Sequence, residues 1–249
     1  GINAEYGQLK TSPTAENLDQ LRYYVLNNQI ANSERVQAWF WLLQASHNPQ
    51  LYKQYLQQPS SSLKSILKDA QRTFSDIPLF QQPQTTESLI RIMNAVCTFS
   101  NNKIKYFQGM NAICGLLFFV TRSESQSFSL AIRLLEKFDF NQQLKNCELV
   151  LKECQEFVER QSRNQMLVQQ LQKNRTFAMS FLLSKLTCCC PLEEIVKIWD
   201  KLLVENEFLV KMAAAAVVNA EKEVLNGWNG LGELEIQTEA VWGTFLKMV

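Results

Sequence analysis

Several features that define common protein classes are scarce in this sequence. It has 249 residues but a single histidine, and its 25 lysines and arginines nearly balance 24 aspartates and glutamates. Because the net charge is only +1 and the basic residues are scattered, we expect no nucleic-acid partner. One histidine, with no base at suitable spacing, also argues against a hydrolase that uses a cysteine–histidine pair or a serine–histidine–aspartate triad.

Long apolar runs are missing as well. The longest extends from Ala112 to Val120, which is far too short to cross a bilayer, so we expect a buried helix there and no transmembrane segment. The first residues show no charged stretch followed by an apolar one, and no signal peptide is therefore expected. Seven cysteines, an odd number without regular spacing, favour a reducing, cytoplasmic setting over a disulfide-bonded secreted domain.

The motifs that bind metals and nucleotides are absent too. Cys188, Cys189 and Cys190 are adjacent and lack the paired C-x-x-C spacing of zinc sites, so we expect buried thiols and no metal. Cys147 and Cys154 are expected to lie in the core of one helix. The sequence contains neither a G-x-x-x-x-G-K-[ST] loop nor a G-x-G-x-x-G loop. The protein is therefore expected to need no cofactor of its own.

Turn-forming residues are few, at 8 glycines and 6 prolines, and apolar residues recur at the spacing of helices. This pattern predicts an all-α fold. One helix is expected to have Ser33 as its N-cap, a second to open at Thr86, and a third to contain Pro191 in its first turn. His47, beside an asparagine and a proline, is expected to cap a helix C-terminus in solvent.

The second half of the chain follows the same helical pattern. One long helix, or two adjoining helices, should cover residues 144–172, where glycine and proline are absent. A glycine-rich loop at 226–232 should separate a last helix at 239–247. Because no segment of about 20–50 residues repeats, we expect no regular solenoid. We expect a single large domain over residues 1–249, with about residues 1–15 as an N-terminal extension.

Two short motifs stand out from this background. Residues 66–74 read I-x-x-D-x-x-R-T-F, and residues 106–111 read Y-x-Q-G-M-N. Polar, proline-bearing stretches flank the first motif and predict a helix that ends at Arg72–Phe74 beside a surface loop. Gly109 should open the helix that holds the long apolar run. Arg72 and Gln108 would then each lie at the end of an element.

Together, in this order, the two motifs resemble the catalytic-finger motifs of the TBC domain, the fold of Rab GTPase-activating proteins. The resemblance extends along the chain: Arg35 and Trp39 resemble the signature of the family's first helix, and Trp199 and Asp200 its late Ile-Trp-Asp motif. It implies a single, V-shaped, all-α domain in which these four residues are structural. Residues 176–192 look most similar to the small TBC proteins of the yeast spindle-position checkpoint and septation pathway.

The resemblance also implies a function, which is to accelerate GTP hydrolysis by a Rab-family or Rab-related small GTPase. Arg72 would stabilise the charge on the transferring phosphoryl group, and Gln108 would orient the attacking water. Magnesium and GTP would arrive with the GTP-bound partner. A scaffold protein is a further expected partner, and such partners would recruit the chain to membranes or to microtubule-organising structures.

The neighbours of the two fingers would support them. Asp69 would hold the guanidinium group of Arg72, with Thr73 and Phe74 completing the first motif. In the second motif, the resemblance assigns the packing of the finger loop and its backbone turn to three residues, Tyr106, Gly109 and Met110. One departure is Ser75, which stands where the family usually has proline.

Other interpretations of the same residues remain open. Arg72 and Asp69 could form an ordinary surface ion pair three residues apart, with Gln108 as a helix-capping amide. The chain could also be a catalytically weak TBC-fold scaffold that binds a small GTPase or a regulatory partner. A third interpretation is an unrelated helical binding protein.

Overall fold

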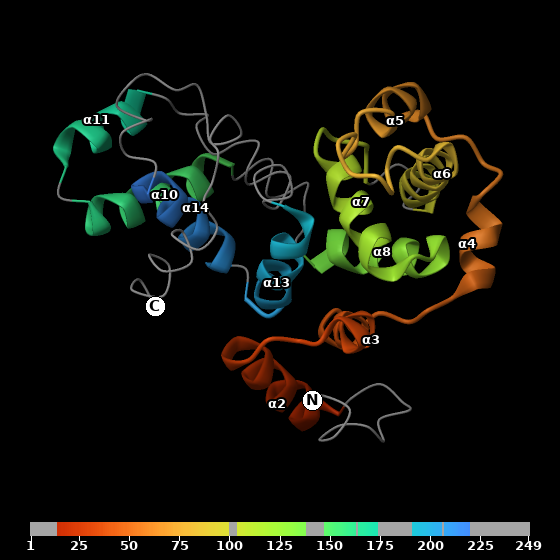
Figure 1. Ribbon diagram of the computed structural model, residues 1–249, viewed down its shortest axis with the longest axis horizontal. Helices are drawn as coiled ribbons and strands as arrows, with labels where there is room; N and C mark the ends of the chain where they lie inside the picture. Colours follow the sequence, from red (N-terminus) through yellow and green to blue (C-terminus); the bar gives the residue numbers. More distant parts are fainter. Residues whose placement is uncertain are drawn as a thin grey trace. The chain divides into compact units, whose positions relative to one another are not determined.

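The computed structural model describes residues 14–99, 104–137, 147–162, 164–173, 191–205 and 207–219. Within these ranges every regular element is a helix, which confirms the all-α prediction (Figure 1). The predicted loop at 226–232, the predicted last helix and Cys188–Cys190 lie outside the described residues. The helices are α2 (Ala15–Asn27), α3 (Asn32–Leu42), α4 (Pro49–Tyr55), α5 (Leu63–Ala70), α6 (Pro83–Phe99), α7 (Met110–Thr121), α8 (Glu124–Lys137), α10 (Cys147–Gln161), α11 (Gln165–Lys173), α13 (Leu192–Leu202) and α14 (Glu207–Asn219).

The chain divides into two compact units. The first comprises Gly1–Phe140 with Trp199–Val204, and the second comprises Asn141–Ile198 with Glu205–Val249. Both candidate finger motifs fall in the first unit. Whether the whole chain forms the single expected domain stays a prediction.

The core of the first unit lies among α5, α6, α7 and α8, which pack against one another (Figure 1). Helix α6 contacts the other three and also α4. Phe128 of α8 is fully buried and meets two aromatic rings, Tyr52 at 5.3 Å and Phe99 at 5.9 Å between centroids. The apolar run of α7 is buried from Ala112 to Leu117, and this part of the buried-helix prediction is confirmed.

Three predicted helix starts are wrong by one to three positions. Ala31, and not Ser33, is the N-cap of α3, because its carbonyl already accepts the N–H of Arg35 at 3.1 Å. Helix α6 begins at Pro83, ahead of Thr86, since proline has no N–H to lose in a first turn. Pro191 precedes α13, and its carbonyl accepts the N–H of Ile195 at 3.0 Å.

A buried lysine closes the C-terminus of α2. Lys201, in the last turn of α13, donates to the backbone carbonyls of Val25, Leu26 (2.9 Å) and Asn28 (2.7 Å). A cation at this end of a helix satisfies carbonyls that have no partner within the helix and complements its dipole. Burial lowers the pKa of Lys201, and the negative charge of Asp200 offsets part of this shift.

The two signature residues of α3 meet the end of α13. Arg35 is almost fully buried and donates from Nε to Asp200 Oδ1 at 3.0 Å, and Trp39 Nε1 donates to the same oxygen at 2.7 Å. The rings of Trp39 and Trp199 lie 5.8 Å apart. A buried ion pair of this kind adds little net stability, because both charges lose their water, but removal of one partner alone is costly.

The second unit contains α10, α11 and α14. The predicted helical stretch at 144–172 is two helices, α10 and α11, which contact each other, and α10 also packs against α14. Val158 of α10 is fully buried as predicted, and Phe157 lies under the guanidinium of Arg160 at 4.9 Å. The side chains of Cys147 and Cys154 lie outside the described part of the chain.

Candidate functional site

Helix α5 buries one face and stops just before Arg72. Ile66, Asp69 and Ala70 are buried on that face. Beyond Ala70 the backbone continues in tight turns, in which the N–H of Arg72 donates to the carbonyl of Asp69 at 3.2 Å. Phe74 has a φ of 48°, a left-handed conformation that prevents the helix from continuing. The helix thus ends slightly earlier than predicted, and Arg72 lies in the turn that follows it.

The carboxylate of Asp69 contacts both Arg72 and the loop that carries Gln108. Asp69 Oδ1 accepts from Arg72 Nε at 2.9 Å and lies 2.8 Å from Arg72 Nη2, while Oδ2 accepts a hydrogen bond from the hydroxyl of Tyr106. The side chain of Asp69 is only 10% exposed, whereas that of Arg72 is 58% exposed. The guanidinium is therefore anchored at its base and faces solvent at its tip.

Gln108 lies on the second loop, two residues after Tyr106. Its side chain is exposed and forms no hydrogen bond with any residue that the structure describes. Gly109, with a φ of 109°, is the N-cap of α7, and no side chain caps this helix. The alternative role of Gln108 as a helix cap is therefore wrong. Met110 follows, fully buried, with its sulfur 3.9 Å from Cys97 Sγ.

A second set of contacts holds the turn that contains Arg72, Thr73 and Phe74 against α7. Thr73 is buried and donates to the carbonyl of Asp69 at 2.7 Å, and its hydroxyl oxygen accepts from Asn111 Nδ2 at 2.9 Å. A Cβ added to Gly115 would lie 2.7 Å from a ring carbon of Phe74, closer than side chains approach one another. The glycine thus allows the loop to lie directly on the helix.

The tyrosine that joins the loops stays a hydrogen-bond donor. Burial raises the pKa of Tyr106 well above its usual value, and the hydrogen bond to Asp69 raises it further. Because the hydroxyl keeps its proton across the ordinary pH range, it can donate continuously to the carboxylate.

Some residues of this site were not singled out from the sequence. Gly115 lies within an ordinary apolar run, and its role depends on contact with Phe74, which no local pattern reveals. Asn111 ends the second motif, so the motif itself was the signal that could have found it. Arg35, Trp39, Trp199 and Asp200 form a separate structural cluster, described above.

His47 does not have its predicted role. Helix α3 ends with Leu43 as its C-cap, whose own N–H donates to Trp39, so no histidine cap is present. Instead, His47 Nε2 lies 2.9 Å from the hydroxyl of Ser125, and its ring packs edge-on against Phe40. The contact between α8 and the segment after α3 explains the difference.

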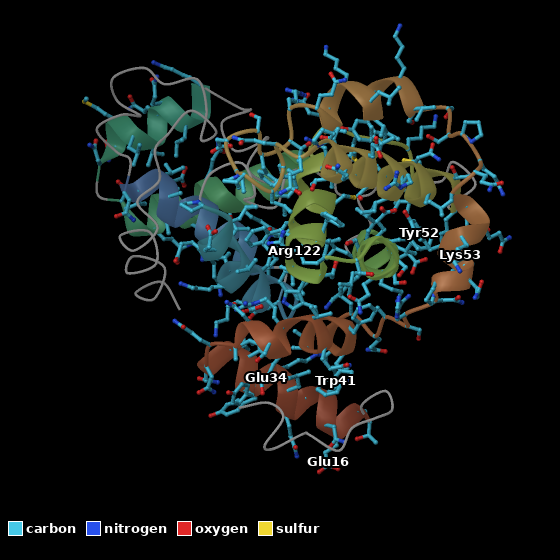
Figure 2. The ribbon with its side chains drawn as sticks, turned by 45° about the vertical axis from the view of Figure 1, so that its right-hand side comes forward. Glu16, Glu34, Trp41, Tyr52, Lys53 and Arg122 are labelled. Carbon is cyan, nitrogen blue, oxygen red and sulfur yellow. The ribbon has the colours of Figure 1, made fainter. Side chains whose placement is uncertain are left out.

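A cluster of polar side chains on α4, α6 and α8 was not predicted from the sequence. Glu124 accepts from Arg91 Nη2 at 2.7 Å, from Ser88 at 2.7 Å and from Tyr52, which Figure 2 labels. Burial opposes ionisation of this carboxyl, but the hydrogen bonds from Arg91, Tyr52 and Ser88 outweigh it, and the pKa of Glu124 is lowered. Its contacts tie three helices together.

No metal site and no membrane-spanning helix occur in the described ranges. No group of three or more histidine, cysteine, aspartate or glutamate side chains gathers there in a way that could hold a metal ion. None of the helices in the same ranges has the length and apolar character to span a bilayer.

The chain belongs to the Rab-GTPase-TBC domain family, whose model matches residues 32–225. It is 29% identical to Cell division control protein 16 of Schizosaccharomyces pombe over 197 residues, which cover 74% of this chain and 65% of that protein. It is 32% identical to the putative mitotic check point protein BUB2 of Dictyostelium discoideum over 151 residues, which cover 57% of this chain and 39% of that protein. The chain therefore spans less than two thirds of the length of these relatives.

The fold agrees with the family. The crystal structure of the Chlamydomonas flagellar RabGAP TBC domain matches with a TM-score of 0.70 at 19% identity, over 100% of this chain and 85% of that one. The resemblance to the TBC domain that the two motifs suggested is thus confirmed. The printed names of these two relatives, a cell division control protein and a putative mitotic check point protein, agree with the expected checkpoint subgroup.

Proposed function

We propose that this domain activates GTP hydrolysis by a Rab-like small GTPase, supplying Arg72 and Gln108 to the partner's nucleotide site. Membership of the Rab-GTPase-TBC family supports the activity and the class of partner. The observation that carries the assignment of residues is the shared carboxylate of Asp69, which binds Arg72 with one oxygen and the loop of Gln108, through Tyr106, with the other.

The chemistry follows from what a GTPase lacks. Charge builds on the phosphoryl group during its transfer, and an arginine supplied in trans compensates it, which accelerates hydrolysis by about 10³- to 10⁵-fold. Arg72 uses Nε and Nη2 on Asp69, and Nη1 forms no hydrogen bond with the described residues, so this amino group can reach phosphate oxygens. The exposed amide of Gln108 would orient the attacking water.

The domain itself holds neither the nucleotide nor its magnesium in this proposal. Its part is positional: the contact between Tyr106 and Asp69 limits how far the two loops can separate, and the contacts of Thr73 and Phe74 on α7 fix the backbone beside Arg72. Preorganisation of this kind lowers the cost of assembling the transition state.

The decisive experiment is GTP hydrolysis by a panel of purified small GTPases, with wild-type domain and with Arg72→Lys. We expect at least one GTPase to be stimulated, and the lysine variant to lose about 10³-fold of that stimulation, because lysine lacks the planar fork. Lys53→Arg, an exposed position on α4, serves as the control for a basic substitution. Full stimulation by Arg72→Lys would refute the arginine finger.

The second candidate is a scaffold, since the Arg72–Asp69 contact is also the geometry of an ordinary ion pair. A GTPase activator is complementary to the transition state of phosphoryl transfer. It should therefore bind a GDP-loaded partner more tightly when a fluoride mimic of the transferring phosphoryl group is added. The mimic should add nothing to the affinity of Arg72→Ala. Equal affinity of the wild-type domain with and without the mimic would favour the scaffold.

A further inference from the structure

The outward side of α5 carries a distinct set of residues. Lys64, Leu67, Lys68 and Gln71 recur at the three- and four-residue spacing that places side chains on one face of a helix, and all four are exposed. We call these four residues the α5 outer face. Arg72 stands four residues beyond Lys68, in the turn that follows α5. The candidate finger thus comes directly after the α5 outer face in the chain.

The lysines of this face have no acidic partner. Several exposed cations on other helices pair with an acid one turn away, as in Arg22–Asp19, Arg133–Glu136 and Lys197–Glu194. Neither Lys64 nor Lys68 forms an ion pair with any residue in the described ranges. The acid of their own helix, Asp69, is already bound to Arg72 and Tyr106.

The basic character extends to the neighbouring loop. Lys105 is exposed and directly precedes Tyr106, whose hydroxyl contacts Asp69 at the base of α5. The α5 outer face also exposes an apolar side chain, because Leu67 is 43% accessible. A leucine between two lysines can add contact area at the centre of a surface whose charge attracts an acidic partner.

We propose that the α5 outer face docks on an acidic surface of the GTPase that borders its nucleotide site. This inference rests on the proposed function, since Arg72 can reach the γ-phosphate only if the surface continuous with it faces the GTPase. Unpaired lysines there would speed the encounter and orient it, because opposite charges steer association. An anionic membrane is the less suitable occupant, since the α5 outer face itself carries only two lysines, Lys64 and Lys68, and recognition of lipid by charge usually takes clusters of about four to eight basic residues.

The test compares two lysines in equivalent settings. Lys68 lies in the last turn of α5 and Lys53 in the last turn of α4, where Figure 2 labels it, and both are exposed. Lys68→Glu and Lys53→Glu therefore change the net charge and the helix-end electrostatics alike. Stimulated hydrolysis by each variant is measured as kcat and kcat/KM, at low and at high ionic strength.

We expect Lys68→Glu to lower kcat/KM about tenfold at low salt, and Lys64→Glu combined with Lys68→Glu to lower it further. The kcat at saturating GTPase should stay near the wild-type value, because Arg72 and Gln108 are intact. The deficit should shrink at high salt, because the screening length falls from about 10 Å at 0.1 M to about 3 Å at 1 M ionic strength. Lys53→Glu should change kcat/KM less than twofold, as expected of a charge remote from the contact.

The outcomes separate this inference from the proposed function. If Lys68→Glu and Lys53→Glu behave alike while Arg72→Lys abolishes stimulation, docking through the α5 outer face is wrong and the proposed function stands. If no GTPase is stimulated, the proposed function fails, and affinity of the same variants for GTP-loaded GTPases decides the docking. Loss of binding to phosphatidylserine vesicles in Lys68→Glu, with unchanged affinity for the GTPase, would overturn the inference in favour of a membrane surface.

Discussion

The hydroxyl of Tyr106 donates a hydrogen bond to Asp69, 37 residues earlier in the chain, and this contact joins the two loops that carry Arg72 and Gln108. It leaves the other carboxylate oxygen of Asp69 to Arg72. A single buried carboxylate therefore connects an arginine and a glutamine that lie far apart in sequence. We therefore expect the positions of these two side chains to depend on each other, and substitution tests this expectation.

The first prediction concerns that hydrogen bond. Tyr106→Phe should keep the ring in place and remove one donor from Asp69, at a cost of about 1.5–3 kcal/mol of the free energy of unfolding, as for hydrogen bonds to charged groups. The loop of Gln108 then loses its tether, so stimulated kcat should fall about tenfold or more. Urea unfolding and hydrolysis at saturating GTPase measure the two effects.

The matched control is Tyr23→Phe, because Tyr23 is an exposed tyrosine of α2. That variant should leave both the unfolding midpoint and the hydrolysis rate unchanged. Wild-type kcat in Tyr106→Phe would show that the tether does not position the glutamine.

The second prediction concerns Gly115. Glycine-to-alanine substitution inside a helix ordinarily stabilises by about 1 kcal/mol, but here the new methyl group would lie 2.7 Å from a ring carbon of Phe74. We expect Gly115→Ala to destabilise the protein by about 1–3 kcal/mol instead, as overpacked cores do. The measurement is the free energy of unfolding in urea.

A second substitution isolates the contact. In a Phe74→Leu background the ring carbon at 2.7 Å is gone, while the methyl group of Thr73 at 3.0 Å remains. Gly115→Ala should therefore cost less there, and the double-mutant cycle should show coupling above about 0.5 kcal/mol. Additive effects of the two substitutions would mean that the loop and α7 do not meet closely.

How much of this site the sequence predicts depends on how local each feature is. Gly109 opens α7 as expected, because a positive φ favours glycine and the pattern around it is local. The end of α5 near Arg72 was predicted to within a few residues for a similar reason. Ser33 has the side chain of a typical N-cap, but it lies one residue inside α3, whose actual N-cap, Ala31, lacks a capping side chain.

Long-range contacts lie beyond any such pattern. Glu124 receives its partners from positions 33 to 72 residues away in the chain, so nothing near it in sequence marks it as buried and paired. Gly115 is comparable, because its partner Phe74 belongs to another element. The resemblance to the TBC motifs was informative where local patterns were not, because it assigned residues 66–74 and 106–111 to the same site.

The third prediction concerns the pH dependence of stability. Because folding lowers the pKa of Glu124, its contribution is complete above the unfolded value of about 4.3 and is lost as the pH falls through the folded value. Glu124→Gln should therefore cost about 2 kcal/mol at neutral pH, and the difference from wild type should shrink as the pH falls below that of the unfolded carboxyl.

Urea unfolding at a series of pH values between neutral and acidic checks this expectation. Glu87→Gln is the control, since Glu87 is 66% exposed and lies 3.6 Å from the same arginine, Arg91. It should change stability little at any pH, as surface ion pairs do. A Glu124→Gln deficit that stays constant into the acid range would contradict a stabilising carboxylate.

The fourth prediction separates the structural cluster from the fingers. Asp200→Asn removes the negative charge that faces Arg35 in a nearly dry setting, where both side chains are at most 5% exposed. An unpaired buried charge costs about 3–5 kcal/mol, so we expect a large fall in the free energy of unfolding. Asp19→Asn, which removes the exposed partner of Arg22, should cost less than about 0.5 kcal/mol.

The same pair of variants also tests whether Asp200 takes part in catalysis. Below the unfolding temperature of Asp200→Asn, folded protein should retain wild-type kcat towards a stimulated GTPase, because Arg72, Gln108 and their shared carboxylate are untouched. A fall in kcat comparable to that of Arg72→Lys, in protein shown to be folded by circular dichroism, would place Asp200 in the machinery of hydrolysis. A normal kcat with reduced stability would keep it as the partner of Arg35 and Trp39 in the core.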